Sequence, residues 1–145
     1  MKKLLLTLFI SLGIIGLTTA NADNAPHGWF ELGAGADRIH YLEMMTMKEK
    51  NGYLYVWEMA DFYEPYEDEG GFFDGSMSYK AYSQVDCDMY RLKNLSYILY
   101  TQPLGEGLGE DYEPPNKWIY PPSNNKDYGL IDTACMAYDT LDFYK

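Results

Sequence analysis

The sequence contains few of the residues that catalytic, metal-binding and nucleic-acid-binding sites usually require. Of its 145 residues, 2 are histidine, 2 are cysteine and 11 are lysine or arginine, whereas 22 are aspartate or glutamate. The resulting net charge of −11 repels phosphate backbones and anionic lipid headgroups, so no nucleic-acid or membrane-surface partner is expected. We expect a partner that is basic, neutral or aromatic.

Long apolar runs are also scarce, and the run at the start of the chain predicts export. Two lysines precede the apolar run Leu4–Leu17, and the small-x-small pattern Ala20-Asn21-Ala22 follows it. These are the three parts of a secretory signal peptide. A membrane anchor is the alternative, but the run is shorter than the roughly 20 residues that a transmembrane helix needs. We predict a signal peptide over residues 1–22 and one exported domain over residues 23–145, located in the periplasm, at the cell surface or outside the cell, without stable membrane insertion.

The two cysteines, Cys87 and Cys135, both lie in the predicted exported domain. In an oxidising compartment such a pair is most simply one intramolecular disulfide. A two-thiol metal site would need further histidine or cysteine ligands near these positions, and the sequence offers none. We therefore predict a disulfide between Cys87 and Cys135.

The alternation of apolar and polar residues predicts an antiparallel sheet. The expected strands cover residues 29–32, 37–47, 53–62, 77–89, 95–101 and 118–120. The pair Asn51-Gly52 between the second and third strands favours the positive φ values of a hairpin turn. In the fourth strand, Cys87 and Met89 are expected on the core-facing side. The segments 64–75 and 102–116 are rich in glycine, proline and acidic residues and are expected to be loops.

Beyond the last strand, the period of the apolar residues becomes that of a helix. Asn124 can cap its start, and Asp127 places a negative charge in its first turn. The apolar stripe of this helix consists of Tyr128, Ile131, Cys135 and Tyr138. Because both cysteines face the core, the helix has to lie across the sheet. The predicted fold class is α+β, with a single antiparallel β-sheet of five or six strands and a C-terminal helix packed on one face and tethered by the disulfide.

Several short motifs occur in an order that is specific, although each motif is weak alone. They are Trp29, Asp37–Leu42, Val56-Trp57, Tyr82–Cys87, Tyr90-Arg91-Leu92, Trp118–Ser123 and Cys135. In this order, and over nearly the whole exported domain, the sequence resembles the surface-adhesin protein E-like family of small exported bacterial proteins. The acidic segments 64–75 and 104–115 and the tail 139–145 are not part of the family pattern.

The resemblance implies an antiparallel sheet with a disulfide-tethered C-terminal helix, in agreement with the residue pattern. It also implies a non-enzymatic role, because the proteins that give the family its name are surface proteins that bind host matrix proteins. Asp86, Arg91 and Trp118 are interpreted as structural residues of the shared motif. Two arrangements are open for Asp86 and Arg91: an ion pair, or contacts with the end of the helix.

Tyrosine is unusually frequent, with 15 copies. It offers a large contact area and a polar tip at little cost in side-chain entropy, so binding surfaces are rich in it. Aromatic residues also favour packing between strands, and we assign most of the tyrosines to that role. The candidate ligand contacts are Tyr63, Tyr66 and Tyr112 in the loops, together with His40. A tyrosine and His40 could form a pocket for haem or another small molecule on the open sheet face, although the sequence has no haem attachment motif and we expect no cofactor.

Catalytic and metal-binding interpretations have less support. His27 and His40 belong to no recognisable nucleophile motif, and a disulfide offers no thiolate, so we do not predict an enzyme. The many carboxylates leave a glycosidase-like pair open, because sequence alone does not single one out. The run Gly105–Gly109 resembles a dinucleotide-binding loop only superficially, because Glu110 stands where the third glycine is required.

The acidic loop could hold a calcium ion. Its carboxylates are Glu64, Glu67, Asp68, Glu69 and Asp74. Their spacing lacks the alternation of an EF-hand loop, and a run of charges is usually a solvated loop. We therefore expect no metal at this position.

Three functions follow from the sequence. The first is an exported interaction domain that binds protein ligands, such as a host matrix protein, through exposed strands and through acidic, aromatic loops. The second is a periplasmic protein that binds haem or another small molecule. The third is a periplasmic inhibitor or envelope factor.

Overall fold

Six β-strands follow one another along the chain, and each pairs with its sequence neighbours, so the sheet is an antiparallel meander in the order β1-β2-β3-β4-β5-β6. The structure is a computed structural model that describes residues 25–142. Its elements are β1 (Trp29–Ala34), β2 (Arg38–Lys50), β3 (Tyr53–Phe62), β4 (Ser78–Asp86), β5 (Arg91–Tyr100), the 3₁₀ turn η1 (Pro103–Gly105), β6 (Gly109–Tyr112) and the helix α1 (Lys126–Asp142). The predicted signal peptide, residues 1–22, lies outside the described residues.

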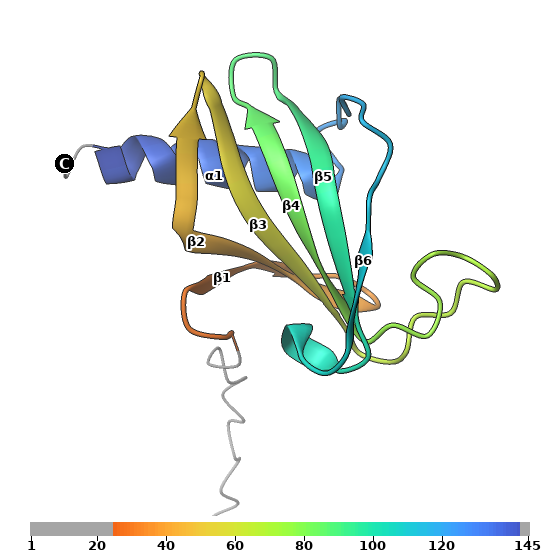
Figure 1. Cartoon of the computed structure of the whole chain (residues 1–145). Helices are drawn as coiled ribbons and strands as arrows, with labels where there is room; N and C mark the ends of the chain where they lie inside the picture. The colour runs from red at the N-terminus through yellow and green to blue at the C-terminus, as the bar shows by residue number, and fades with distance from the viewer. Residues whose placement is uncertain (1–24, 143–145) are drawn as a thin grey trace, which may run out of the picture.

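The helix α1 lies across one face of the sheet (Figure 1). The side chains between sheet and helix form a core cluster in which each is at most 4% exposed. The cluster consists of Leu42, Leu54, Val56, Val85, Leu92, Leu130, Ile131 and Ala134. Within residues 25–142, no α-helix lies on the other face, which we call the open face, and the 3₁₀ turn η1 covers one end of it through hydrogen bonds to Asp61 and Ser78. The predicted fold class is therefore confirmed.

A second apolar cluster fills the part of the covered face that α1 does not reach. There the segment 63–77 folds back over the sheet, and its aromatic side chains point inward. The ring of Tyr66 stacks on Phe62 with centroids 4.8 Å apart, and Phe73 contacts Tyr79 at 5.0 Å. The acidic segment 64–75 is thus a loop, as predicted, but its aromatic residues anchor it to the core.

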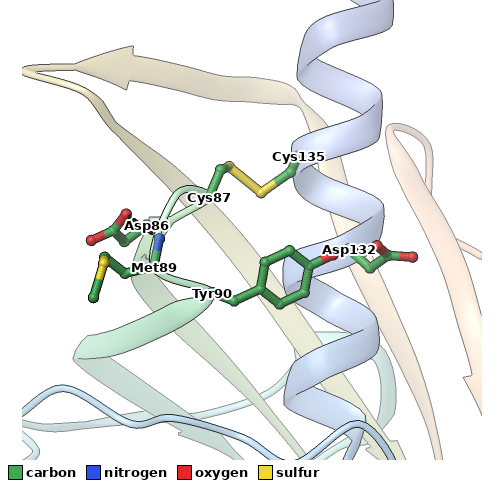
Figure 2. Close-up of a disulfide and its surroundings, with 6 residues drawn as sticks. All are labelled: Asp86, Cys87, Met89, Tyr90, Asp132 and Cys135. Carbon is green, nitrogen blue, oxygen red and sulfur yellow. Dashed lines mark hydrogen bonds between the residues drawn. A yellow bond between two sulfur atoms is a disulfide. The ribbon is translucent and has the colours of Figure 1, made fainter.

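The turn after β4 carries one end of the disulfide (Figure 2). Cys87 in this turn is bonded to Cys135 of α1, 48 positions further along the chain, and their Cα atoms are 5.9 Å apart. From the same turn, the hydroxyl of Tyr90 donates a hydrogen bond to the carboxylate of Asp132 on α1. The turn therefore holds the helix at two neighbouring points, one covalent and one polar.

The carboxylate of Asp86 organises this turn. One of its oxygens accepts a hydrogen bond from the backbone N–H of Met89 at 3.1 Å. The other pairs with Nε of Arg91 at 2.8 Å. Because Asp86 and Arg91 are also the last residue pair of the β4–β5 ladder, the ion pair closes the base of the turn.

Three predictions about the strands are wrong. The strand expected over 77–89 ends at Asp86, and Met89 lies in the following turn with 57% of its surface exposed instead of facing the core. No strand forms over 118–120, where Ile119 makes a single bridge to Leu92. The sixth strand, β6, lies inside the predicted loop 102–116, because the glycines there are followed by residues that pair with the edge of β5.

The helix begins close to the predicted position. The side chain of Asn125, rather than that of Asn124, accepts the capping hydrogen bond from the backbone N–H of Asp127, at 2.8 Å. Asp127 lies in the first turn, where its negative charge interacts favourably with the positive end of the helix dipole. Within residues 25–142, no helix is both long enough and apolar enough to cross a membrane.

Loss of the disulfide should destabilise the fold strongly. The bond closes a loop of 48 positions, which on the chain-entropy estimate contributes about 4 kcal/mol. We expect the double variant Cys87→Ser, Cys135→Ser to lose roughly this free energy of unfolding in urea denaturation. Chemical reduction of the wild type should give the same loss. Two alkylatable thiols in the denatured, unreduced protein would contradict the bond itself.

Candidate functional site

Aromatic side chains line the open face of the sheet. Tyr55 and Trp57 of β3 alternate with the buried residues of that strand and contact Tyr82 of β4, with ring centroids 6.1 and 4.9 Å apart. Near the end of the hairpin, Tyr53 contacts Trp118 at 5.6 Å. These rings are half-buried, because neighbouring side chains cover their edges while the helix lies on the opposite face.

Basic side chains lie over several rings of the open face. The ammonium of Lys80 is 5.5 Å from the ring centre of Trp29 and 5.3 Å from that of Tyr100. The ammonium of Lys93 is 4.5 Å from the centre of Trp118. Cations at these distances are attracted by the electron-rich ring faces. The open face is therefore aromatic with local positive charge, although the whole chain is strongly acidic.

The three predicted motif residues, Asp86, Arg91 and Trp118, meet at one end of the open face. The guanidinium of Arg91 lies 4.3 Å above the ring centre of Trp118 while Nε pairs with Asp86. Its NH1 donates a hydrogen bond to the hydroxyl of Tyr120 at 2.9 Å. The bonds to Tyr120 and to Asp86 raise the pKa of Arg91. Arg91 thus joins the turn at the disulfide to the chain before α1.

The three loop tyrosines proposed as ligand contacts differ in exposure. Tyr63 is 49% exposed and Tyr112 is 38% exposed. Tyr66 is half-buried between Phe62 and the guanidinium of Arg38, which lies 4.9 Å from its ring centre. Tyr63 and Tyr112 therefore offer surface to a partner, whereas the ring of Tyr66 serves mainly in packing.

In the two loops that could hold an ion or a phosphate, polar groups already form hydrogen bonds within the protein. In the acidic loop, Asp74 accepts a hydrogen bond from the backbone N–H of Asp68 at 3.0 Å. Within residues 25–142, no group of three histidine, cysteine or acidic side chains is arranged as a metal site. In η1, the N–H of Leu104 donates to Asp61 at 2.6 Å and that of Gly105 donates to Ser78 at 2.9 Å.

His40, the fourth proposed contact, lies on the covered face, so the expected Tyr–His pocket on the open face is wrong. It pairs with Ala60 of β3 and lines a cavity of about 340 Å³ between the sheet and the start of α1. Burial and the charges of Lys126 and Arg38 lower the pKa of His40 to about 4, so its ring is neutral at pH 7. The alternative of a small-molecule pocket therefore moves to the covered face.

Glu58 is the residue of this cavity that sequence reasoning missed. It occupies a core-facing position of β3 and is only 6% exposed. Burial raises the pKa of its carboxyl, and the charge of Lys126 opposes this effect. An acidic residue among the inward-facing Val56 and Ala60 was the available signal, but the abundance of carboxylates in the chain concealed it.

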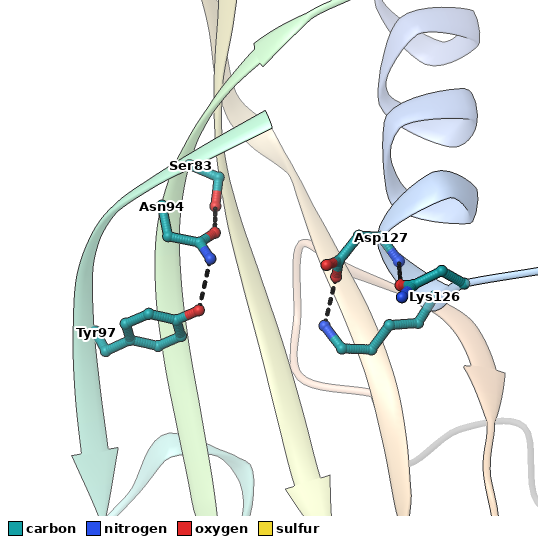
Figure 3. Close-up of polar contacts among 6 residues, drawn as sticks. Ser83, Asn94, Tyr97, Lys126 and Asp127 are labelled. Atoms are coloured by element: carbon teal, nitrogen blue, oxygen red, sulfur yellow. Dashed lines mark hydrogen bonds and ion pairs between the residues drawn. The ribbon is translucent and has the colours of Figure 1, made fainter. Parts of the chain in front are cut away.

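Polar groups of neighbouring elements surround this part of the covered face (Figure 3). The ammonium of Lys126 pairs with the Asp127 carboxylate at 2.6 Å. On β4 and β5, Ser83 donates a hydrogen bond to the side-chain oxygen of Asn94 at 2.9 Å, and the Asn94 amide donates to the Tyr97 hydroxyl at 2.6 Å. Burial, followed by the charge of Glu58, raises the pKa of Tyr97.

Removing the charge of Glu58 should change how stability depends on pH. Because its pKa is raised in the folded protein, the unfolded chain releases this proton first as pH rises, and the folded state loses stability until pH passes the folded pKa. The groups that act on this titration are Lys126 and Asp127. We expect Glu58→Gln to be more stable than wild type at pH 8, with a smaller difference at pH 4.

The measurement is urea denaturation of both proteins across this pH range. Glu31→Gln, which removes an exposed carboxylate from β1, is the control for the loss of one negative charge. A difference from wild type that stays constant with pH in Glu58→Gln would show that its carboxyl does not titrate differently on folding.

Comparison with solved structures identifies the same fold elsewhere. One structure of Haemophilus influenzae protein E superposes with a TM-score of 0.61 at 15% sequence identity, covering 80% of this chain and 93% of that one. A second structure of that protein gives a TM-score of 0.56 at 14% identity, covering 78% and 89% of the two chains. At these identities the likeness establishes the fold alone. Among curated proteins, no relative matches the chain.

The family is established by sequence. The profile of the family described as surface-adhesin protein E matches residues 29–136, which include all six strands, the disulfide and most of α1. The match spans well over half of the chain, and the motif order and the fold agree with it. The chain therefore belongs to the surface-adhesin protein E family.

Proposed function

We propose that the protein is a non-enzymatic, exported adhesin-like protein that binds another protein at the cell surface or in the envelope. Family membership makes it a surface-adhesin-like protein. The observation that carries the finer proposal is the open face, where half-buried rings of Tyr55, Trp57 and Tyr82 form a continuous aromatic surface. Tyrosine and tryptophan at such positions provide most of the binding energy in many protein interfaces.

The charges on the open face favour a protein partner with acidic groups near its contact surface. Lys80 and Lys93 lie over aromatic rings, where a carboxylate of the partner could reach them. Lys48 and Lys50 of β2 lie on the same face of the sheet, opposite Tyr55 and Tyr53, and are exposed. This differs from the basic, neutral or aromatic partner that net charge alone predicted, because these lysines lie beside the aromatic rings of the open face. A host matrix protein remains the proposed class of ligand.

Substitutions on the open face test this proposal. We expect the double variant Tyr55→Ser, Trp57→Ser to bind an immobilised basement-membrane extract at least about tenfold more weakly than wild type, since aromatic anchors of an interface contribute about 2 kcal/mol or more. Lys93→Glu keeps the aromatic packing and should weaken binding through charge alone. Retention on the extract is measured by surface plasmon resonance, and near-ultraviolet circular dichroism checks folding.

The matched control is Tyr63→Ser, which removes an exposed ring from the segment that follows β3. It should bind as wild type does. Loss of binding in Tyr63→Ser with full binding in the open-face variants would instead assign the contact to the acidic, aromatic loops.

A further inference from the structure

The cavity on the covered face has the features of a binding site for a small molecule. It lies between the edge strand β1 and the start of α1 and measures about 340 Å³. We call it the Glu58 cavity. Its apolar wall includes Leu32, Ala34 and Leu130. Such a mixture of apolar wall and few polar groups is typical of small-molecule sites.

Glu58 is buried without a hydrogen-bond or ion-pair partner among residues 25–142. Although only 6% of it is exposed, its carboxylate makes no hydrogen bond or ion pair with any group of residues 25–142. The carboxylate oxygens of Glu58 are not fully enclosed by protein atoms. They therefore face the cavity that Glu58 lines. A buried carboxylate without a partner is costly, and proteins keep such groups mainly where a ligand or a reaction uses them.

Gly129 lines the cavity on the helix side. It lies in α1 and lines the cavity, and a β-carbon added there would meet no atom within 4 Å. Glycine inside a helix costs about 1 kcal/mol relative to alanine. No steric contact demands a glycine at this position, so the space beside it is large enough to accept a side chain.

The charges around the cavity leave Glu58 as the group that a ligand can neutralise. Lys126 is already paired with Asp127 at 2.6 Å, and its charge acts on Glu58 without a hydrogen bond or ion pair between the two side chains. His40 has its pKa lowered to about 4 by burial and by the charges of Lys126 and Arg38, so it carries no charge at pH 7. An anion would be repelled by the Glu58 carboxylate, whereas a cation would supply its missing partner.

We propose that the Glu58 cavity binds a small organic cation, an ammonium or guanidinium group on a short apolar body, with the cation against the Glu58 carboxylate. The apolar body packs against Leu32 and Leu130. This site lies on the opposite side of the sheet from the open face, so the inference does not depend on the proposed function.

Benzylamine, benzyl alcohol and benzoate test the proposal, because they have similar shapes and differ in charge. Binding to the whole exported protein is followed by amide chemical shifts in NMR titrations at pH 7.5. We expect benzylamine to bind at least about tenfold more tightly than either of the others, with the largest shifts in β1 and the first turns of α1. Equal binding of benzylamine and benzyl alcohol, or no binding of benzylamine, would overturn the proposal.

Two variants locate the cation. Glu58→Gln keeps the size of the side chain and should weaken benzylamine at least about tenfold while leaving benzyl alcohol unchanged. Lys126→Met removes the nearest competing cation and should tighten benzylamine. Unchanged benzylamine binding in Glu58→Gln, or weaker binding in Lys126→Met, would overturn the assignment of the cation to Glu58.

Gly129 supplies a test that leaves the carboxylate in place. Gly129→Phe should fill the cavity and abolish benzylamine binding, whereas the matched control Gly129→Ala should retain it and raise the free energy of unfolding by up to about 1 kcal/mol. Full binding in Gly129→Phe would place the ligand elsewhere and overturn the proposal. Tyr55→Ser, Trp57→Ser should bind benzylamine as wild type does, which separates this site from the open face.

Discussion

The disulfide between Cys87 and Cys135 is the constraint on which the arrangement of the molecule depends. The helix contributes three fully buried side chains, Leu130, Ile131 and Ala134, to the core, which is a small apolar surface for an element of 17 residues. Packing of this extent would hold the helix weakly, because most helical stability in proteins comes from a buried face. The covalent bond removes that weakness by fixing the middle of α1 against the end of the sheet.

The position of the helix also decides where cavities form. Because α1 is tethered at the turn after β4, it covers that end of the sheet, and the segment 63–77 covers the other end with Tyr66, Phe72 and Phe73. Polar side chains lie on the covered face between these two layers, among them Ser83 and Glu58. A single continuous apolar core would have left no room for a buried carboxylate. The two-part cover is therefore the structural origin of the Glu58 cavity.

The fold was predictable from the sequence to the extent that local patterns determine it. Alternation in β3 and helical spacing around Cys135 gave the sheet, the helix and the disulfide that joins them. The errors arose where tertiary pairing overrides local preference. The edge strand β6 forms in a glycine-rich segment because β5 offers unpaired backbone groups, a contact that no local pattern reveals. Glu58 and its cavity depend on which elements cover the sheet, and for this reason sequence reasoning placed His40 on the wrong face.

The register of β3 links the two sides of the molecule. Trp57 contributes to the open face and the next residue, Glu58, lines the cavity on the other face. Because side chains alternate along a strand, a slip of one residue would exchange them and bury the wrong set. The turn at Asn51-Gly52, with φ values of 56° and 81°, pairs Lys50 with Tyr53, and an irregularity between Glu43 and Lys48 shifts the register before Glu43 pairs with Trp57. The aromatic surface and the buried carboxylate are thus placed by the alternation of one strand, whose pairing with β2 is set by the turn and by this irregularity together.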